Sequence, residues 1–276
     1  MIVNKDVIKS RNNPFVKWVC TLQDKKGREQ ERRFMAEGHK LVFEAISAGL
    51  PVTDCIIMQS KVNEYTDKLY QLLECEGFEE TCITVVDDSV FEKISTEKAP
   101  QGLIAIIKYL DNFKDMDIIY KEDFFLEHDE KAIILCSLRD PSNLGAVVRS
   151  AVAFGKEHII LTNDCADVYN TKTIRSAMGS LFRVKVTRVG SLADAISGMR
   201  DNGRRVYAAE LTDRAVSLKS VDLSSKDVFI IGNEGHGIPG EISEMCDASV
   251  FIPISTSTES LNASVAASII MWEQSK

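Results

Sequence analysis

Residues able to bind a ligand or assist a reaction gather in three short segments, and each segment follows a run of apolar residues. SLRDPSNLGAVVRS follows AIILC, NEGHGIPGE follows VFIIG, and STSTESLNAS follows ASVFIPI. Glycines let backbone amides and carbonyls approach a ligand closely, and amide and hydroxyl side chains can orient it. An arginine can grip a phosphate and stabilise negative charge that develops on oxygen. Together the three segments predict a binding or catalytic site.

The first segment carries one candidate for chemistry, Arg149, the only charged residue of NLGAVVRSAVAFG. It is either a solvated or salt-bridged helix charge or a residue of the site. Arg149 lies six residues after Asn143, which is about 600° around a helix, so the two side chains do not share a face. If Asn143 caps the helix, a position that asparagine favours, both side chains can still line one site.

The second segment contains a literal G-x-G-x-x-G pattern, residues 235–240, directly after an apolar run. A dinucleotide-binding loop would stand in the first strand–helix unit of its domain, with an acidic residue ending the next strand. Here the next apolar run ends at Ile254 and is followed by Ser-Thr-Ser-Thr. The surroundings of the pattern therefore argue against a nicotinamide cofactor. His236 in this loop is a conceivable general base, but its position favours an incidental loop residue.

The elements that must position these segments alternate regularly from residue 131 onward. Apolar runs predict strands at 132–136, 158–162, 183–187, 205–211, 228–232 and 248–254, and helical spacing predicts helices at 143–155, 171–182, 191–203 and 261–274. Such alternation is typical of a parallel sheet that is covered on both faces. A parallel sheet binds its ligand outside the carboxyl ends of its strands, where all three segments begin.

Residues 1–108 predict a smaller α/β domain. A Lys/Arg-rich stretch, KKGREQERRFMAEG, leads into a helix, HKLVFEAISAG, that ends at Gly49. Short apolar runs at 55–58, 83–86 and 103–107 alternate with further helical stretches. Residues 109–130 are strongly acidic with little periodicity and are predicted to be a linker. Residues 131–276 form the second domain.

The net charge of −8 argues at first sight against a nucleic-acid partner, but it conceals two basic blocks. Residues 1–40 hold ten basic and five acidic residues, and residues 137–188 hold eight basic and four acidic residues. The acidic surplus lies mainly in residues 41–136. Local basic patches, rather than total charge, would then govern any contact with nucleic acid.

The seven cysteines are odd in number and show no C-x-x-C spacing, so we expect neither a disulfide framework nor a metal site. Cys136 lies in an apolar run and is expected to be buried. No run of about 18 apolar residues predicts a membrane span, and the first residues lack the apolar core of a secretory signal. A cytoplasmic protein with no membrane partner is expected.

The three segments together resemble the three motifs of the SpoU/TrmH class of SPOUT methyltransferases. The first is Asn143-x-Gly145-x-x-x-Arg149, and the second is residues 231–237, IGNEGHG. The third is residues 252–254, IPI, followed by residues 259–266, ESLNASVA. SRNNPFVKW, EGHKLVFEA and PQGLIAI resemble the substrate-binding domain that precedes many such enzymes.

The resemblance implies 2′-O-ribose methylation of RNA with S-adenosylmethionine, a C-terminal trefoil knot, and a homodimer whose site is completed across the interface. It favours 23S ribosomal RNA as the substrate. Transfer RNA, and a non-catalytic RNA-binding assembly factor, stay open as alternatives. The resemblance implies catalytic roles for Asn143, Arg149, Glu234, Ser260 and Asn262. It implies cofactor contacts from Leu211, Ile231, Gly232, Asn233, Gly235, Ile252, Ile254, Leu261 and Asn262.

The family's proposal makes Arg149 the general base, but a guanidinium is protonated at all ordinary pH values. We therefore expect Arg149 to hold the adjacent phosphate and to stabilise alkoxide charge, with Glu234 orienting it. Basic residues expected to contact RNA are Lys25, Lys26, Arg28, Arg32, Arg33, Arg139 and Arg175. Their alternative role is that of solvated surface charges.

Overall fold

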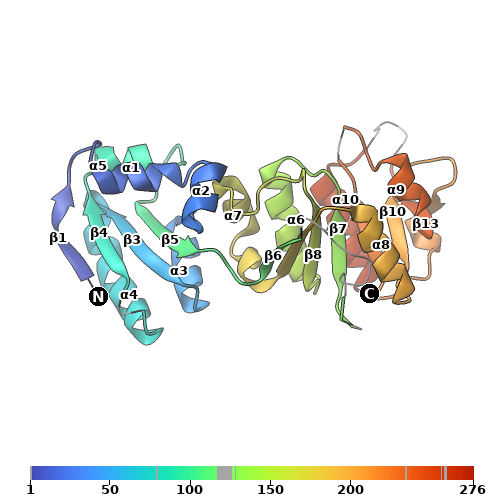
Figure 1. Cartoon of the computed structure of the whole chain (residues 1–276), viewed down its shortest axis with the longest axis horizontal. Helices are drawn as coiled ribbons and strands as arrows, with labels where there is room; N and C mark the ends of the chain where they lie inside the picture. Colours follow the sequence, from blue (N-terminus) through green and yellow to red (C-terminus); the bar gives the residue numbers. More distant parts are fainter. Residues whose placement is uncertain are drawn as a thin grey trace. The chain divides into compact units, whose positions relative to one another are not determined.

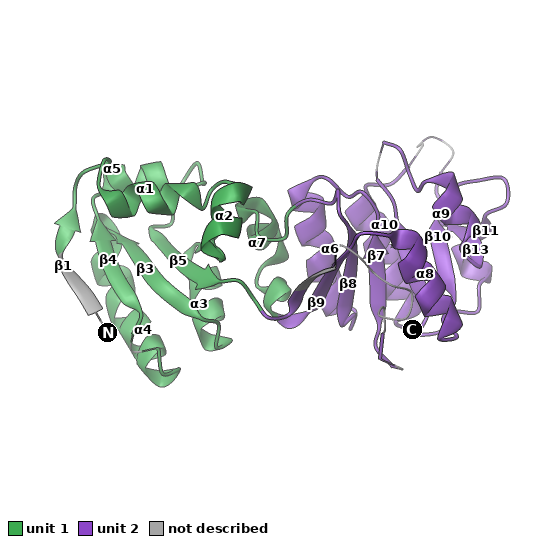
Figure 2. Cartoon of the chain, viewed as in Figure 1, with its two compact units in different colours: residues 1–110, 167–182 green, residues 111–166, 183–276 purple. Residues whose placement is uncertain are grey.

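The computed structural model describes residues 2–78, 80–116, 126–127, 129–233, 235–255, 257 and 260–276 (Figure 1). The chain divides into two compact units (Figure 2). Unit 1 comprises residues 1–110 and 167–182, and unit 2 comprises residues 111–166 and 183–276. Residues 167–182 therefore belong to unit 1, although they lie in the second half of the sequence.

Unit 1 is built on a five-stranded sheet in the order β1-β4-β3-β5-β2. The strands are β1 (Ile2–Ile8), β2 (Arg33–Glu37), β3 (Val52–Met58), β4 (Cys82–Val86) and β5 (Leu103–Lys108). The helices are α1 (Pro14–Thr21), α2 (Lys25–Glu31), α3 (His39–Ser47), α4 (Val62–Cys75), α5 (Asp88–Ile94) and α7 (Thr171–Ala177). The α/β prediction for this half is confirmed. The antiparallel pairing of β5 with β2 and β3 was not predicted.

Apolar faces of the helices explain how unit 1 is held together. Val16 and Val19 of α1 and Phe91 of α5 are fully buried in one cluster with Ile56 and Ile104 of the sheet. α3 and α4 contact each other and strands of the same sheet. Burial of this apolar surface is the main favourable contribution to the stability of the unit.

Unit 2 contains an eight-stranded sheet in the order β11-β13-β10-β12-β7-β8-β9-β6, and every pair is parallel. The strands are β6 (Phe113–Met116), β7 (Ala132–Leu135), β8 (His158–Thr162), β9 (Lys185–Val189), β10 (Val206–Ala209), β11 (Val216–Ser217), β12 (Val228–Ile231) and β13 (Ala248–Phe251). The helices are α6 (Pro141–Ala153), α8 (Leu192–Asp201), α9 (Gly240–Glu244) and α10 (Ala263–Gln274). The predicted parallel sheet is confirmed.

The two faces of this sheet are covered by different helices. Residues of α8 and α9, among them Ile196 and Ile242, form one buried cluster with β7, β10 and β12. α6 and α10 pack against each other, α10 also contacts β12, and neither contributes to that cluster. They therefore cover the opposite face.

Several predicted boundaries were wrong. The strands expected at 205–211 and 248–254 end at Ala209 and Phe251, because the residues beyond them leave the sheet. The helix expected at 171–182 ends at Ala177, where Met178 adopts a left-handed conformation with φ 48°, and a 3-10 turn follows at Ser180–Arg183. The edge strand β6 lies within the stretch predicted as a linker. This edge strand was missed because its sequence, FKDM, contains charged residues, which are common both in edge strands and in loops. Residues 117–125 and 128 of that stretch lie outside the described residues.

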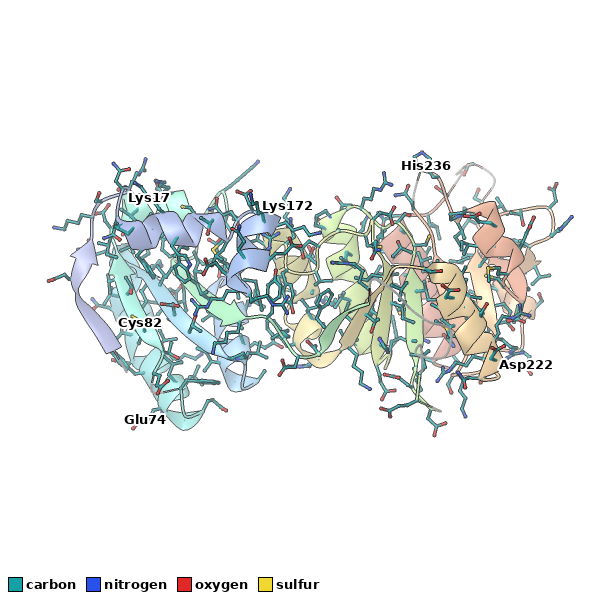
Figure 3. All side chains as sticks on the ribbon, viewed as in Figure 1. Lys17, Glu74, Cys82, Lys172, Asp222 and His236 are labelled. Atoms are coloured by element: carbon teal, nitrogen blue, oxygen red, sulfur yellow. The ribbon has the colours of Figure 1, made fainter. Side chains whose placement is uncertain are left out.

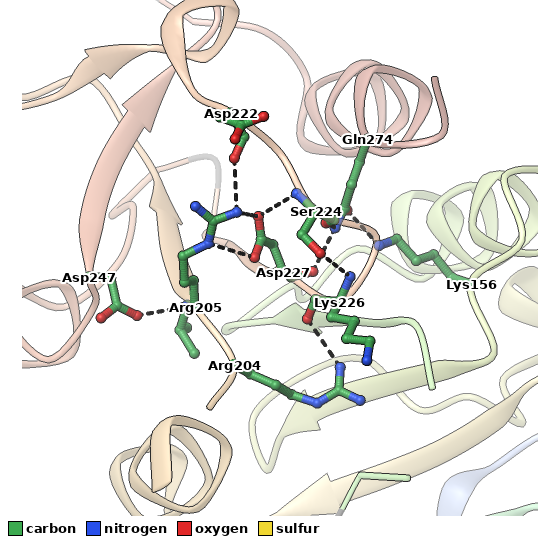
Figure 4. A network of polar contacts seen from close by, with 10 residues as sticks. Lys156, Arg204, Arg205, Asp222, Ser224, Lys226, Asp227, Asp247 and Gln274 are labelled. Atoms are coloured by element: carbon green, nitrogen blue, oxygen red, sulfur yellow. Dashed lines mark hydrogen bonds and ion pairs between the residues drawn. The ribbon is translucent and has the colours of Figure 1, made fainter. Parts of the chain in front are cut away.

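A polar network joins the ends of α6 and α10 to the loop before β12 (Figure 4). Lys156, just after α6, donates to Oε1 of Gln274, and Nε2 of Gln274 lies 2.7 Å from the carbonyls of both Ser224 and Asp227. Arg205 makes two hydrogen bonds to the Asp227 carboxylate, at 2.9 and 2.7 Å. The network fixes the C-terminal end of α10, whose N-terminal end lies at the site described below.

Cys136 is 3% exposed, as predicted, and all seven cysteines are free thiols. In the part of the chain that the structure describes, no helix is both long enough and apolar enough to cross a membrane.

Candidate active site

The three polar segments meet at one edge of the unit 2 sheet. They follow β7, β12 and β13, and the order β13-β10-β12-β7 places the carboxyl ends of these strands close together. The backbone N–H of Cys136 donates to the carbonyl of Ile231 at 2.8 Å, and that of Glu210 donates to Val250 at 2.9 Å. The predicted convergence at this edge is confirmed.

The first segment begins α6, and its cap differs from the predicted one. Asp140 is the N-cap, and its Oδ1 accepts the backbone N–H of Asn143 at 2.8 Å. Asn143 therefore lies inside the first turn and does not cap the helix. The sequence Asp140-Pro141 indicates this helix start, because proline favours the first helical position after a capping aspartate.

Asn143 instead contacts the third segment. Its Oδ1 accepts a hydrogen bond from Nδ2 of Asn262 at 3.1 Å. Asn262 is the N-cap of α10, and its Oδ1 accepts the backbone N–H groups of Ser264 and Val265 at 2.9 and 3.4 Å. One asparagine side chain thus starts α10 and ties that start to α6.

A second hydrogen bond holds the same two helices farther along. Oγ of Ser268 in α10 lies 2.8 Å from Oγ of Ser150 in α6. Small buried residues of both helices, including Ala151 and Ala267, allow this close approach. The first and third segments are therefore positioned by one packed helix pair.

The second segment is a tight loop organised by Asn233. Its Oδ1 accepts the backbone N–H groups of Gly235 and His236 at 2.8 and 3.2 Å, and its Nδ2 donates to the carbonyl of Ser137 at 2.9 Å. A Cβ added to Gly232 would lie 2.6 Å from the backbone carbon of Gly237. Gly232 therefore permits a backbone approach that any other residue would block.

Two of the expected catalytic residues are placed without partners at this edge. Arg149 is exposed on α6, and it makes no hydrogen bond or ion pair with the residues that the structure describes. Ser260 is exposed, directly before Leu261. Glu234, expected to orient Arg149, lies outside the described residues. The ring of His236 is exposed and points away from the ribbon (Figure 3).

Apolar side chains are unusually exposed at the same edge. Leu211, just after β10, is 71% exposed, and Ile254, just after β13, is 37% exposed. Ile252 and Leu261 are half-buried, and Ile231 is 3% exposed. Exposed apolar walls beside free backbone groups are suited to a flat heterocycle such as adenine.

Comparison with known proteins assigns the family. The SpoU rRNA methylase family matches residues 130–272, and the MRM3-like substrate binding domain matches residues 13–105. The chain belongs to the SpoU rRNA methylase family. The resemblance predicted from the three motifs is confirmed.

Relatives of this SpoU-family chain match it over nearly their whole length. It is 27% identical over 265 residues to the 23S rRNA (guanosine(2553)-2′-O)-methyltransferase RlmP of Bacillus subtilis, covering 96% of this chain and 97% of that protein. It is 28% identical over 272 residues to the 23S rRNA (uridine(2479)-2′-O)-methyltransferase of Streptomyces viridochromogenes, covering 96% and 90%. The structure of an AdoMet-bound rRNA methyltransferase from Sinorhizobium meliloti superposes with a TM-score of 0.81 at 29% identity, covering 99% and 97%.

The family uses S-adenosylmethionine, and the residues at the sheet edge fit that molecule. The close approach at Gly232 leaves backbone groups accessible, and Leu211 and Ile254 offer apolar contact area for adenine. The described part of the loop holds no basic residue other than a histidine, which suits a cofactor that carries no phosphate.

Most residues expected to contact RNA lie on the surface, and Arg28 is the exception. Lys25 and Lys26 of α2 are exposed, and Lys25 pairs with Glu29 at 3.6 Å. Arg28 is 2% exposed, and its guanidinium donates to the Asp167 carboxylate and to the carbonyls of Leu22 and Gln23. Arg28 therefore holds unit 1 together, and we omit it from the proposed RNA surface.

The remaining basic candidates each have a defined contact. The guanidinium carbon of Arg32 lies 4.6 Å from the ring centre of Tyr109, and that of Arg33 lies 5.4 Å from the ring centre of Trp18. Arg139 pairs with Asp164 at 3.1 Å, and Arg175 pairs with Glu97. These ion pairs reduce the charge that the two arginines offer to RNA.

Proposed function

We propose that this chain, an S-adenosylmethionine-dependent RNA 2′-O-methyltransferase of the SpoU family, modifies a ribose of 23S ribosomal RNA. The observation that carries the proposal is the joint placement of the three motifs at one sheet edge, tied by the Asn143–Asn262 hydrogen bond. The relatives named above, whose names specify 23S rRNA, support this substrate over transfer RNA.

The backbone of the cofactor-binding loops would be held by Gly232, Asn233, Gly235 and Asn262. The adenine of S-adenosylmethionine would be surrounded by apolar side chains, those of Leu211, Ile231, Ile252, Ile254 and Leu261. The cofactor would supply a methyl group on a sulfonium to the ribose 2′-oxygen: the bond from the methyl carbon to sulfur would break as the new C–O bond forms, and the hydroxyl proton would pass to water. Asn262 fixes the start of α10 against α6 through its bond to Asn143. Motion of that helix start would misplace residues of the site, which in-line transfer does not tolerate.

Arg149 contacts the RNA rather than removing the proton. Its guanidinium stays protonated at all ordinary pH values, so it stabilises negative charge on the phosphate and on the developing alkoxide. Its exposure, without a partner among the described residues, leaves its donors available for such an anion. Glu234 and Ser260 orient the arginine and the ribose.

A second copy of the chain covers the exposed face of α10. Val265 and Trp272 are 46% and 50% exposed, and with half-buried Ile269 they follow the spacing of a single apolar stripe. Exposed aromatic and branched side chains in such a stripe are typical of a subunit interface. α6, which carries Arg149, packs against the same helix, so Arg149 of one protomer can reach the cofactor of its partner.

In this proposal the C-terminal segment threads as a trefoil knot. The protein works in the cytoplasm. Residues 1–108 bind the RNA, and residues 131–276 carry the catalytic domain. Of the stretch 109–130, strand β6 belongs to the sheet of that domain. Phosphate contacts come from Lys25, Lys26, Arg32 and Arg33, with smaller contributions from Arg139 and Arg175.

Mapping of 2′-O-methyl groups across cellular RNA, with and without the gene for this chain, tests the proposal. We expect a ribose methyl group in 23S rRNA to disappear and to return with the wild-type gene. Loss of a methyl group from transfer RNA alone would overturn the substrate. An unchanged map, with no S-adenosylmethionine binding by calorimetry, would favour the assembly factor instead.

A further inference from the structure

A column of planar groups runs through unit 1 from its core to its surface. The ring centre of buried Phe34 lies 4.8 Å from that of Tyr169, and the ring of Tyr169 lies 4.0 Å from that of Tyr109 at an interplanar angle of 16°. The guanidinium of Arg32 covers Tyr109. Phe34 and Tyr169 are 0% and 2% exposed, Tyr109 is half-buried, and Arg32 is exposed. The outermost layer is therefore a guanidinium at the surface.

The inner part of the column is held rigidly. The hydroxyl of Tyr169 accepts the backbone N–H of Leu110 at 2.9 Å, and its own N–H donates to Oδ1 of Asp167 at 2.9 Å. The other oxygen of Asp167 is bound by buried Arg28. A charge-assisted pair of this kind is strong when it is shielded from water. The column is thus an anchored platform rather than a chance contact of mobile rings.

Arg32 occupies a backbone position that disfavours it. It is the C-cap of α2 with φ 52° and ψ 41°, the left-handed conformation in which glycine is the usual residue. Its side chain makes no hydrogen bond or ion pair within the described residues, and its contact is with the Tyr109 ring. Backbone strain at a residue whose side chain makes no hydrogen bond or ion pair within the described residues points to a function for the side chain itself.

We propose that the outer face of Arg32 stacks against an unpaired base of the RNA, which becomes the next layer of the column. This inference rests on the proposed function and makes it more specific: unit 1 holds a single-stranded segment of its RNA. Unstacked bases stack well on guanidinium planes, and every base offers a suitable face. A lysine would keep the attraction to phosphate but would lose the flat surface.

Binding of the full chain to a short mixed-sequence single-stranded RNA and to its perfect duplex, each over a range of salt concentrations, tests the inference. We expect Arg32→Lys to weaken single-strand binding by about five- to one-hundredfold at every salt concentration, because the stacking of one base is lost. The slope of log affinity against log salt should not change, since the charge is retained. Duplex binding should stay at the wild-type level.

Lys26→Met is the matched control, because it removes a charge from the first turn of α2, the helix that Arg32 ends, without touching the column. It should flatten the salt slope and weaken single-strand and duplex binding alike. Tyr109→Leu, which removes the support beneath Arg32, should reproduce the selective loss seen with Arg32→Lys. Wild-type single-strand affinity in Arg32→Lys, or equal losses for single strand and duplex, would overturn the stacking role. Methyl transfer to 23S rRNA by the wild-type chain, measured alongside, shows separately whether the proposed function holds.

Discussion

Nδ2 of Asn262 donates a 3.1 Å hydrogen bond to Oδ1 of Asn143, across 119 positions of sequence. The same Asn262 side chain caps α10 through its oxygen. One residue therefore has two separable tasks, of which the first joins two motifs of the site and the second starts a helix. Substitutions can remove one task or both.

Asn262→Asp keeps an oxygen that can cap α10 but replaces the amide donor, whereas Asn262→Ala removes both. We expect Asn262→Ala to lower the free energy of unfolding by about 0.5–2 kcal/mol. Asn262→Asp should be nearly as stable as the wild type, and both variants should bind S-adenosylmethionine more weakly. Thermal unfolding and calorimetry measure the two effects. Asn170→Ala, which removes the cap of α7 in unit 1, is the control and should leave cofactor binding unchanged. Wild-type cofactor affinity in Asn262→Asp would show that the bond to Asn143 does not matter.

Gly232→Ala should abolish cofactor binding. The added Cβ would lie 2.6 and 2.7 Å from the backbone carbon and oxygen of Gly237, so the loop must move away from its present path. Gly240→Ala is the control, because nothing lies within 4 Å of its added Cβ and alanine favours the helix that begins there. Equal cofactor affinities of these two variants would refute the role of the close approach at Gly232.

Arg149→Lys should lose most of its turnover while its affinity for S-adenosylmethionine survives. The lysine keeps the charge but cannot present the paired donors that a phosphate or an alkoxide receives from a guanidinium. Single-turnover methylation rates and calorimetry separate the two quantities. Arg200→Lys, on α8, makes the same change away from the three motifs and should be fully active. Full activity in Arg149→Lys would exclude the catalytic role.

Trp272→Glu should convert a homodimer into a monomer, because a charge in the centre of an apolar interface is costly to desolvate. Sedimentation velocity measures the change. Val216→Glu places the same charge at another exposed apolar residue, on β11, and should leave the mass unchanged. A wild-type chain that sediments as a monomer at all concentrations would contradict the dimer. A Trp272→Glu protein that remains dimeric would place the interface elsewhere.

Lys156 gives unit 2 a distinctive pH dependence. Burial, together with the nearby charge of Lys131, lowers the pKa of Lys156 to about 8. Between about pH 8 and 10 the unfolded chain retains the proton that the folded chain has released, so the free energy of unfolding should rise with pH. This increment should be absent in Lys156→Met. Denaturant unfolding of both proteins at several pH values measures the difference, and identical pH dependence in the two would contradict the lowered pKa.

The sequence predicted the site better than it predicted the contacts that build it. Apolar runs located six of the eight strands of unit 2 and missed β6 and β11. The polar segments after three of these strands located the edge, because strand direction fixes where those segments meet. The burial of Arg28 could not be predicted, since its partner Asp167 lies 139 positions away and a charged residue in a basic stretch resembles a surface residue. The assignment of residues 167–182 to unit 1 could not be predicted either, because their partners in that unit are also distant in the sequence. Their helical spacing is as compatible with one sheet as with the other.

Transfer of a labelled methyl group tests the central claim most directly. The full chain is incubated with unmodified 23S rRNA and S-adenosylmethionine that carries an isotopic label in its methyl group, and the RNA is digested to nucleosides for mass spectrometry. The account predicts label in a 2′-O-methylnucleoside, and its near absence when Arg149→Lys replaces the wild type. Label on a base, or no label in 23S rRNA while transfer RNA is labelled, would contradict it.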